Sequence, residues 1–206
     1  MKSKIPIIVV AVMAILMGLY PLIYLSLDEN VGFLSSKPVE VLGSNIWMTC
    51  FYFHIIFGGI SLLTGWSQFI PKWRNKYLKT HRKLGLVYLA SVTLGGISGF
   101  YMALFANGGL VSSLGFGSLA FLWLFFTLKA YLGIINRDID SHQQWMLRSY
   151  ALTFAAVTLR LWLPALTAFG LEFLFAYKII SWLSWVPNLI FIEWVIRRLQ
   201  VKPGYS

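Results

Sequence analysis

The segment HQQWMLRSYALTFAAVTLR, from His142 to Arg160, decides how this chain folds, because its polar side chains fall on one face of an otherwise apolar helix. A guanidinium deep in a membrane costs about 2.5 to 3.5 kcal/mol on insertion scales. We therefore expect Arg160 to face the protein interior, where it meets a partner, a water-filled cavity or a ligand. The polar residues on this face recur at a spacing of roughly 3.5 residues; they are His142, Ser149, Thr153 and Arg160.

The composition is that of an integral membrane protein. Of the 206 residues, 58% are hydrophobic and only 12% are charged, which lies outside the range of a soluble globular domain. The net charge of +10 does not indicate nucleic-acid binding, because the basic residues lie between long apolar runs, where they favour membrane orientation and anionic headgroups. The single cysteine, Cys50, excludes an intramolecular disulfide and is typical of a small buried residue.

Six apolar segments are long enough to cross a membrane, and they predict an all-α protein in which residues 1–206 form one membrane domain. The first segment is too long for the apolar region of a signal peptide, so we expect it to be retained. Short loops predict an up-and-down bundle with the second to fifth spans as its core and the first and sixth at its periphery. The predicted spans are approximately residues 5–27, 45–70, 81–105, 115–135, 142–169 and 173–195.

Lysine and arginine accumulate in alternate loops, which predicts the orientation of the chain. The loops after the second and fourth spans and the C-terminal tail are basic, whereas the intervening loops carry few basic residues. Because cytoplasmic loops are enriched in lysine and arginine, we expect both termini in the cytoplasm and the chain in a bacterial-type inner membrane. The basic residues between the second and third spans are Lys72, Arg74, Lys76, Lys79, Arg82 and Lys83.

Two histidines, His81 and His142, fall at the predicted cytoplasmic starts of the third and fifth spans. Thr80 and Ser141 precede them as predicted N-caps, and Ser141 forms a capping-box pattern with Gln144. The positive helix ends and the basic residues beside them favour a bound anion. Lipid phosphates and orientation signals are an alternative explanation for the same basic residues.

The third and fifth spans are diagonal partners in a sequential four-helix core. His81 and His142 could therefore ligate the iron of one b-type haem from opposite sides. Arg82 and Arg148 would then meet the haem propionates. In the alternative interpretation, both histidines are solvated residues of the membrane interface.

A second polar layer is predicted in the outer half of the membrane, where His54 and Arg160 share a level. The helical rise places His54 about 24 Å and Arg160 about 27 Å from the cytoplasmic ends of their spans. Along the second span, Gln68 shares a helical face with His54. These residues could bind a quinone carbonyl or a substrate carboxylate, with Tyr101 and Trp47 as companions, or they could form a structural hydrogen-bonded network.

Four short motifs lie along the predicted core spans: His54, GWSQF at residues 65–69, HRKLGLVY at residues 81–88 and HQQWMLRS at residues 142–149. Together they resemble a bacterial family of predicted membrane proteins that is classed as a domain of unknown function. The resemblance covers about Phe51 to Leu166 and implies that these motifs form the working part, without implying a particular activity.

More loosely, the layout is similar to the six-helix, two-haem transmembrane cytochromes b, whose central helices carry paired histidines. The chain departs from that pattern because it has three histidines instead of four, and the predicted fourth span has none. A second haem at His54 is therefore not expected.

The sequence leaves three functions open. The leading interpretation is a membrane redox protein that binds one haem between His81 and His142 and a quinone or small reductant near His54 and Arg160. The alternatives are a transporter or binding protein for a small anionic solute, with Arg160 and His54 as its site, and a structural or assembly protein without a ligand. We find no broken-helix signature of ion-coupled transporters and no hydrolase motif, and whether the protein is an enzyme stays open.

Overall fold

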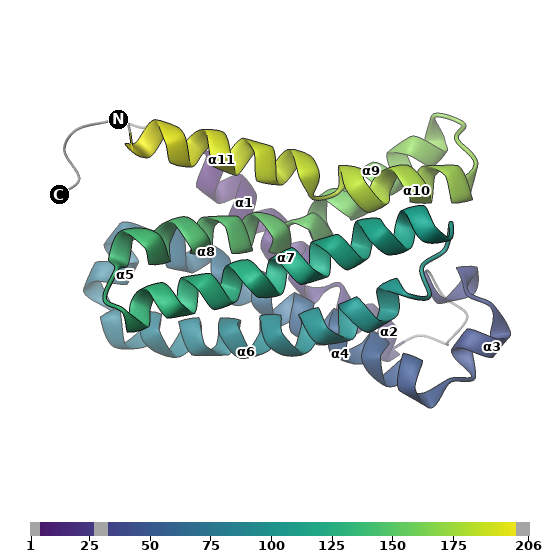
Figure 1. The fold of residues 1–206 in the computed structure, drawn as a ribbon, viewed down its shortest axis with the longest axis horizontal. Helices are drawn as coiled ribbons and strands as arrows, with labels where there is room; N and C mark the ends of the chain where they lie inside the picture. The colour runs from purple at the N-terminus through teal and green to yellow at the C-terminus, as the bar shows by residue number, and fades with distance from the viewer. Residues whose placement is uncertain (1–4, 27–32, 201–206) are drawn as a thin grey trace.

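The computed structural model describes residues 5–26 and 33–200, and all regular structure within them is helical (Figure 1). Six of the helical stretches are long and apolar enough to cross a membrane, which confirms the predicted all-α, six-span architecture. The elements are α1 (Ile5–Leu19), α2 (Pro21–Ser26), η1 (Leu34–Ser36), α3 (Val39–Leu42), α4 (Asn45–Gly65), η2 (Trp66–Phe69), α5 (Pro71–Lys76), α6 (Leu78–Ala103), α7 (Leu110–Ile135), α8 (Ile139–Thr153), α9 (Ala155–Ala168), α10 (Phe173–Leu183) and α11 (Val186–Gln200).

Helices α6, α7 and α8 all begin before the predicted positions. The N-cap of α8 is Asp138, whose carboxylate accepts a hydrogen bond from the backbone nitrogen of Ser141 at 2.9 Å. Helix α6 follows Tyr77, which makes no side-chain cap bond. The predicted N-caps Thr80 and Ser141 are therefore wrong, because both residues already lie inside their helices. A carboxylate at the helix start is also favoured by the positive end of the helix dipole.

Four helices, α4, α6, α7 and α8, form the core of the bundle (Figure 1). Helix α4 packs on α6, α6 on α7 and α7 on α8, so that α6 and α8 are diagonal partners. Outside this core, α1 packs on α4, α10 packs on α7 and α9, and α11 packs on α8. The predicted up-and-down order, with peripheral first and sixth spans, is confirmed.

The fifth and sixth spans are each interrupted, at Phe154 between α8 and α9 and at residues 184–185 between α10 and α11. Asn188 joins the two interruptions, because its Nδ2 donates to the carbonyl of Ala151 at 3.3 Å and to that of Ser184 at 3.1 Å. The Thr158 hydroxyl donates to the same Ser184 carbonyl. These side chains satisfy backbone groups at the interruptions, which cannot be left unpaired inside a membrane.

The sequence shows no broken-helix signature, although Pro164 and Pro187 predict kinks in the fifth and sixth spans. Pro187, at the second position of α11, directly follows the interruption of the sixth span and occupies a position where a missing N–H costs no helical bond. In the fifth span, however, Pro164 lies inside α9 and the interruption falls at Phe154. The sequence around Phe154 contains no glycine or proline that would have indicated it.

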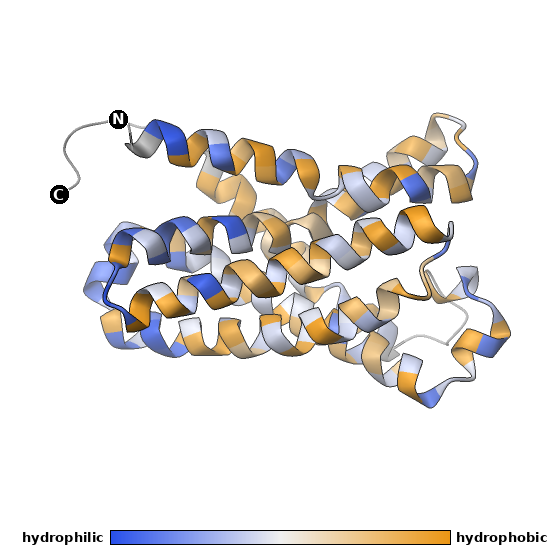
Figure 2. Cartoon of the chain, in the orientation of Figure 1, coloured by the Kyte–Doolittle hydropathy of each residue, from blue (hydrophilic) through white to orange (hydrophobic). Residues whose placement is uncertain are grey.

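Charged residues gather at one end of the bundle, which we call the basic end (Figure 2). This end contains α5, the starts of α6 and α8, and the last turns of α11, whereas the outer surface between the ends is rich in apolar side chains that suit lipid hydrocarbon. The placement of the basic end, and with it of both termini, in the cytoplasm stays a prediction. Its basic residues are Lys72, Arg74, Lys76, Lys79, Arg82, Lys83, Arg137, Arg197 and Arg198.

At the end of the bundle opposite the basic end, the buried Lys37 binds the first loop to the loop between α6 and α7. The Lys37 ammonium donates to the Phe105 carbonyl at 2.5 Å and to Asn107 Oδ1 at 3.0 Å, and it lies over the rings of Phe33 and Trp47. Burial lowers the pKa of Lys37 to about 8, because desolvation disfavours the charged form. These contacts hold the segment after η1 against the loop between α6 and α7.

We expect Gly59→Ala to lower the melting temperature of the detergent-solubilised protein. A Cβ at this position of α4 would lie 2.6 Å from the carbonyl oxygen of Gly18 in α1, so the two helices would have to separate. Gly58→Ala is the matched control, because no atom lies within 4 Å of its Cβ position and alanine favours a helix over glycine by about 1 kcal/mol. Equal melting temperatures of the two variants would contradict the close crossing of α1 and α4.

We also expect the free energy of unfolding to increase as the pH rises through the window set by Lys37. Its folded pKa of about 8 is below the unfolded value of about 10.4, so between these values the unfolded chain binds more protons and rising pH favours the folded state. Melting curves of the native protein and of Lys37→Met, recorded across this window, should diverge with pH. Parallel curves would show that Lys37 does not titrate in this way.

Candidate functional site

A pocket of about 160 Å³ lies at the basic end between η2, α5 and the start of α6. The chain turns sharply after η2, because Ile70 is extended and Pro71 begins α5, and this turn packs α5 against both η2 and α6. Trp73 and Tyr77 provide aromatic walls. All of the lining side chains except that of Leu84 carry a hydrogen-bonding group; they are those of Ser67, Gln68, Trp73, Arg74, Tyr77, Thr80 and His81.

Two buried polar atoms at this pocket, Gln68 Oε1 and His81 Nδ1, have no hydrogen-bond partner in the described part of the chain. The neighbour Ser67 fixes the orientation of the Gln68 amide. The Ser67 hydroxyl donates its proton to the Thr64 carbonyl at 3.2 Å, so it can only accept from Gln68 Nε2 at 3.4 Å, which leaves Oε1 unpaired. An unpaired buried polar atom costs about 1 to 3 kcal/mol.

The surroundings of the pocket are electropositive. Arg74 lines it, and the charges of Arg74 and Arg82 act on His81. The first N–H groups of the long helix α6 add a partial positive charge beside the pocket. No aspartate or glutamate is among its lining residues. Within residues 5–26 and 33–200, no group of three histidine, cysteine or acidic side chains could hold a metal ion.

His142 lies near His81 but has different surroundings. Its Nδ1 donates to the Ala130 carbonyl of α7 at 2.9 Å, because a carbonyl can only accept. The Nε2 atom therefore carries the free lone pair of the neutral ring, as in many metal-ligating histidines. His142 is not among the residues that line the pocket beside His81. The structure thus brings the two predicted histidines to the same end of the bundle, and of the two only His81 lines this pocket.

The two arginines predicted to meet haem propionates differ in their surroundings. Arg82 is exposed at the basic end. Arg148 makes a bidentate pair with Glu193 of α11, with Nε to Oε1 at 2.5 Å and Nη2 to Oε2 at 3.0 Å, and its guanidinium lies 4.5 Å from the centre of the Trp145 ring. Arg148 therefore already has a carboxylate partner within the protein.

His54 and Arg160 lie close together toward the opposite end, where the charge of Arg160 acts on the His54 ring. His54 Nδ1 donates to the Gly95 carbonyl of α6 at 2.8 Å. Arg160 Nη1 donates to the Ala156 carbonyl of its own helix at 2.9 Å, and its guanidinium lies 4.5 Å from the centre of the Tyr20 ring. The described residues offer Arg160 no acidic side chain within ion-pair distance.

The other two predicted members of the outer site are placed differently. Gln68 lies in η2 at the basic end, with His81, and not with His54. Tyr101 packs on the cluster of Trp47, Phe51 and Leu34 at the opposite end. His54 and Gln68 therefore lie toward opposite ends of the second span and do not belong to one site.

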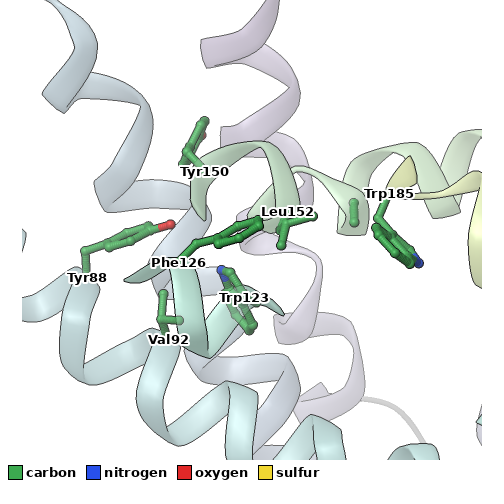
Figure 3. Close-up of a cluster of buried hydrophobic side chains, with 8 residues drawn as sticks. Tyr88, Val92, Trp123, Phe126, Tyr150, Leu152 and Trp185 are labelled. Atoms are coloured by element: carbon green, nitrogen blue, oxygen red, sulfur yellow. The ribbon is translucent and has the colours of Figure 1, made fainter. Parts of the chain in front are cut away.

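A buried polar network occupies the bundle between the basic end and the level of His54. The Tyr88 hydroxyl of α6 is hydrogen-bonded to Ser149 at 2.8 Å and to Thr153 at 2.7 Å, both on α8. From α7, the Trp123 indole donates to Thr153 at 2.8 Å and Thr127 is hydrogen-bonded to Ser149 at 2.6 Å. Figure 3 shows Tyr88 and Trp123 within the apolar cluster that surrounds this network. The network joins three core helices and satisfies their polar side chains away from lipid.

Residues 51–196 match the model of a family described as predicted membrane protein, DUF2306. The chain belongs to this family. No curated protein and no solved structure matches it. The DUF2306 match confirms the resemblance to a membrane-protein family of unknown function and extends it beyond Leu166 into α11. The comparison with two-haem cytochromes is not tested by these matches.

In this DUF2306 chain, the sequence was sufficient to identify the polar residues of the site, but it did not predict which residues lie beside them. Glu193 was missed, although an acidic residue within an apolar span indicates a buried partner. The Gln68 and His81 pairing was also missed, because Gln68 was assigned to the second span as a continuous helix. The 3-10 segment η2 and the turn at Pro71 bring its side chain back beside the start of α6.

Proposed function

We propose that this DUF2306 protein binds a small anion in the pocket at the basic end of the bundle. The observation that carries the proposal is that Gln68 and His81 line one pocket together with Arg74. Each of the first two residues also has a buried polar atom, Gln68 Oε1 and His81 Nδ1, that lacks a hydrogen-bond partner in the described residues.

The charge of the surroundings favours an anion over a neutral or cationic ligand. Arg74 lines the pocket, Arg82 adds positive charge at His81, and the N-terminal end of α6 lies beside it. An arginine can donate two hydrogen bonds to an oxyanion. A pocket of about 160 Å³ is smaller than the roughly 300 to 1,000 Å³ of sites for drug-sized ligands, so the ligand is of the size of an inorganic oxyanion or a short carboxylate.

The interrupted fifth and sixth spans support transport of this anion as the activity of the protein. Discontinuous spans are a common feature of transporters, where they allow parts of the bundle to move against one another. A second positive group, Arg160 beside His54, lies toward the opposite end of the fifth span. In this proposal the two positive sites would receive the anion on the two sides of the membrane, with the packed core at Tyr88 between them.

We expect Arg74→Gln and His81→Ala each to weaken anion binding by about tenfold or more, because a hydrogen bond to a charged group contributes about 1.5 to 3 kcal/mol. Binding would be measured by titration calorimetry of the detergent-solubilised chain with inorganic phosphate, sulfate and acetate. Lys79→Gln is the matched control, because it removes one positive charge from the basic end at an exposed position outside the pocket.

Two outcomes would contradict the location of the site. Equal weakening by Lys79→Gln and Arg74→Gln would assign the effect to the general surface potential. Loss of binding in Arg160→Gln with unchanged binding in His81→Ala would place the anion at His54 and Arg160 instead. The absence of binding for all three anions would contradict the proposal as a whole.

A b-type haem between His81 and His142 is the second candidate, and one observation favours it. The Nδ1 donation of His142 to the Ala130 carbonyl leaves Nε2 available to an iron. Two observations disagree with it: Arg148 is already paired with Glu193, and the pocket beside His81 is not lined by His142. Because the residues fit a haem only in part, we derive no electron-transfer step. A quinone near His54 and Arg160 belongs to this candidate.

The haem candidate predicts Soret and α bands in the dithionite-reduced spectrum of the purified protein, expressed with sufficient haem. Both bands should be lost in His142→Ala and in His81→Ala, because each removes one axial ligand. His54→Ala is the control, since His54 lies toward the opposite end and already donates to Gly95. A native protein without these bands removes the haem candidate and leaves the anion proposal unaffected.

A further inference from the structure

The pocket at the basic end lies at the level where two apolar spans end. One part of its wall comes from the last residues of the second span, Asn45–Phe69, and another from the first turns of the third span, Leu78–Ala103. The connection between these spans, which contains α5, provides the rest. A ligand in this pocket is therefore at the depth of the headgroup layer, where the phosphates of the bilayer lie.

Large apolar side chains beside the pocket are exposed. Trp73 and Tyr77, which line it, are 48% and 51% exposed, and the adjacent Leu78 is 48% exposed. Tryptophan and tyrosine are enriched at the membrane interface, where their amphipathic rings lie among the headgroups. The Trp73 ring also contacts that of Trp66, with centroids 5.8 Å apart, which holds α5 against η2. The pocket thus adjoins a surface that suits lipid better than bulk water.

Arg74 is the pocket residue best able to bind a phosphate. Its side chain makes one hydrogen bond in the described part of the chain, from Nε to Asn75 Oδ1 at 3.5 Å, which is long for an N–H···O bond. Among the described residues, no carboxylate lies within ion-pair distance of Arg74. Its terminal nitrogens are therefore available for the two-pronged contact that arginine makes with phosphate.

We propose that the pocket holds the phosphate of an anionic phospholipid, with Arg74 as its donor and Trp73 and Tyr77 beside its glycerol. The inference rests on the anion site proposed above and names its ligand, and it does not depend on transport. A pocket of about 160 Å³ is too small for a whole phospholipid, so the acyl chains would stay in the bilayer. Because a lipid phosphate is already confined to this depth, its binding costs less translational freedom than that of a free ion.

The charges around the pocket favour an anionic headgroup over a zwitterionic one. Residues 71–83 carry six basic residues and no acidic residue, and basic clusters next to a span attract anionic headgroups. These residues would repel the ammonium group of a choline headgroup. In addition, Lys76 Nζ lies 5.1 Å from the centre of the Tyr77 ring, where a choline would otherwise make its cation–π contact.

The experiment is native mass spectrometry of the full detergent-solubilised chain, which counts individual bound lipids, with phosphatidylglycerol and phosphatidylcholine of the same acyl chains. We expect one phosphatidylglycerol to bind about fivefold or more tightly than phosphatidylcholine. Arg74→Gln should weaken the binding of phosphatidylglycerol by about tenfold or more, because hydrogen bonds to a charged group are lost. Lys79→Gln, which removes an exposed charge outside the pocket, should have a smaller effect.

Glycerophosphoglycerol, which is the headgroup of phosphatidylglycerol without acyl chains, tests the source of the phosphate. We expect it to bind more weakly than the intact lipid. Equal affinities of these two compounds would make a free soluble phosphate ester the ligand, which overturns this inference and leaves the anion site intact.

Two further outcomes also overturn the inference. They are equal affinities of the native chain for phosphatidylglycerol and phosphatidylcholine, and equal weakening by Arg74→Gln and Lys79→Gln. The comparison of lipids on the native chain is decisive even if Arg74→Gln does not fold. Absence of binding for inorganic phosphate, sulfate and acetate as well as for phosphatidylglycerol contradicts the proposed function itself.

Discussion

Every polar group inside a membrane span has to find its partner within the protein, because lipid hydrocarbon offers none. The bonds between Tyr88, Ser149 and Thr153 meet this constraint at the centre of the bundle and tie α6 to its diagonal partner α8. Asn188 meets it where the fifth and sixth spans are interrupted. The arrangement of the core helices depends on these few hydrogen bonds as much as on apolar packing.

The same constraint separates structural polar groups from candidates for binding. The imidazoles of His54 and His142 each donate to a backbone carbonyl, and Arg148 is neutralised by Glu193. In contrast, Gln68 and His81 line one pocket, and each has a buried polar atom that lacks a partner in the part of the chain that the structure describes. This contrast is why we propose an anion site at the basic end and not at the more costly Arg160.

Hydrophobic length and the short loops were sufficient to predict six helices and their order, because lipid leaves few alternatives for an apolar chain. Helix periodicity likewise placed Ser149 and Thr153 on the interior face of the fifth span. It could not predict the break at Phe154 or the turn that carries Gln68 to His81, since both depend on contacts between segments distant in sequence. The capping pattern at Ser141 failed for a local reason, because Asp138 was available three residues earlier.

The pair of Arg148 and Glu193 has a consequence for the biogenesis of the protein. Glu193 belongs to the sixth span, which is synthesised after that of Arg148, and a lone carboxylate there would resist leaving the translocation channel for lipid. Arg148, on the preceding span, forms the ion pair that neutralises this carboxylate. We therefore expect membrane integration of the sixth span to depend on that of the fifth, so that these two spans enter the bilayer together as a helical hairpin.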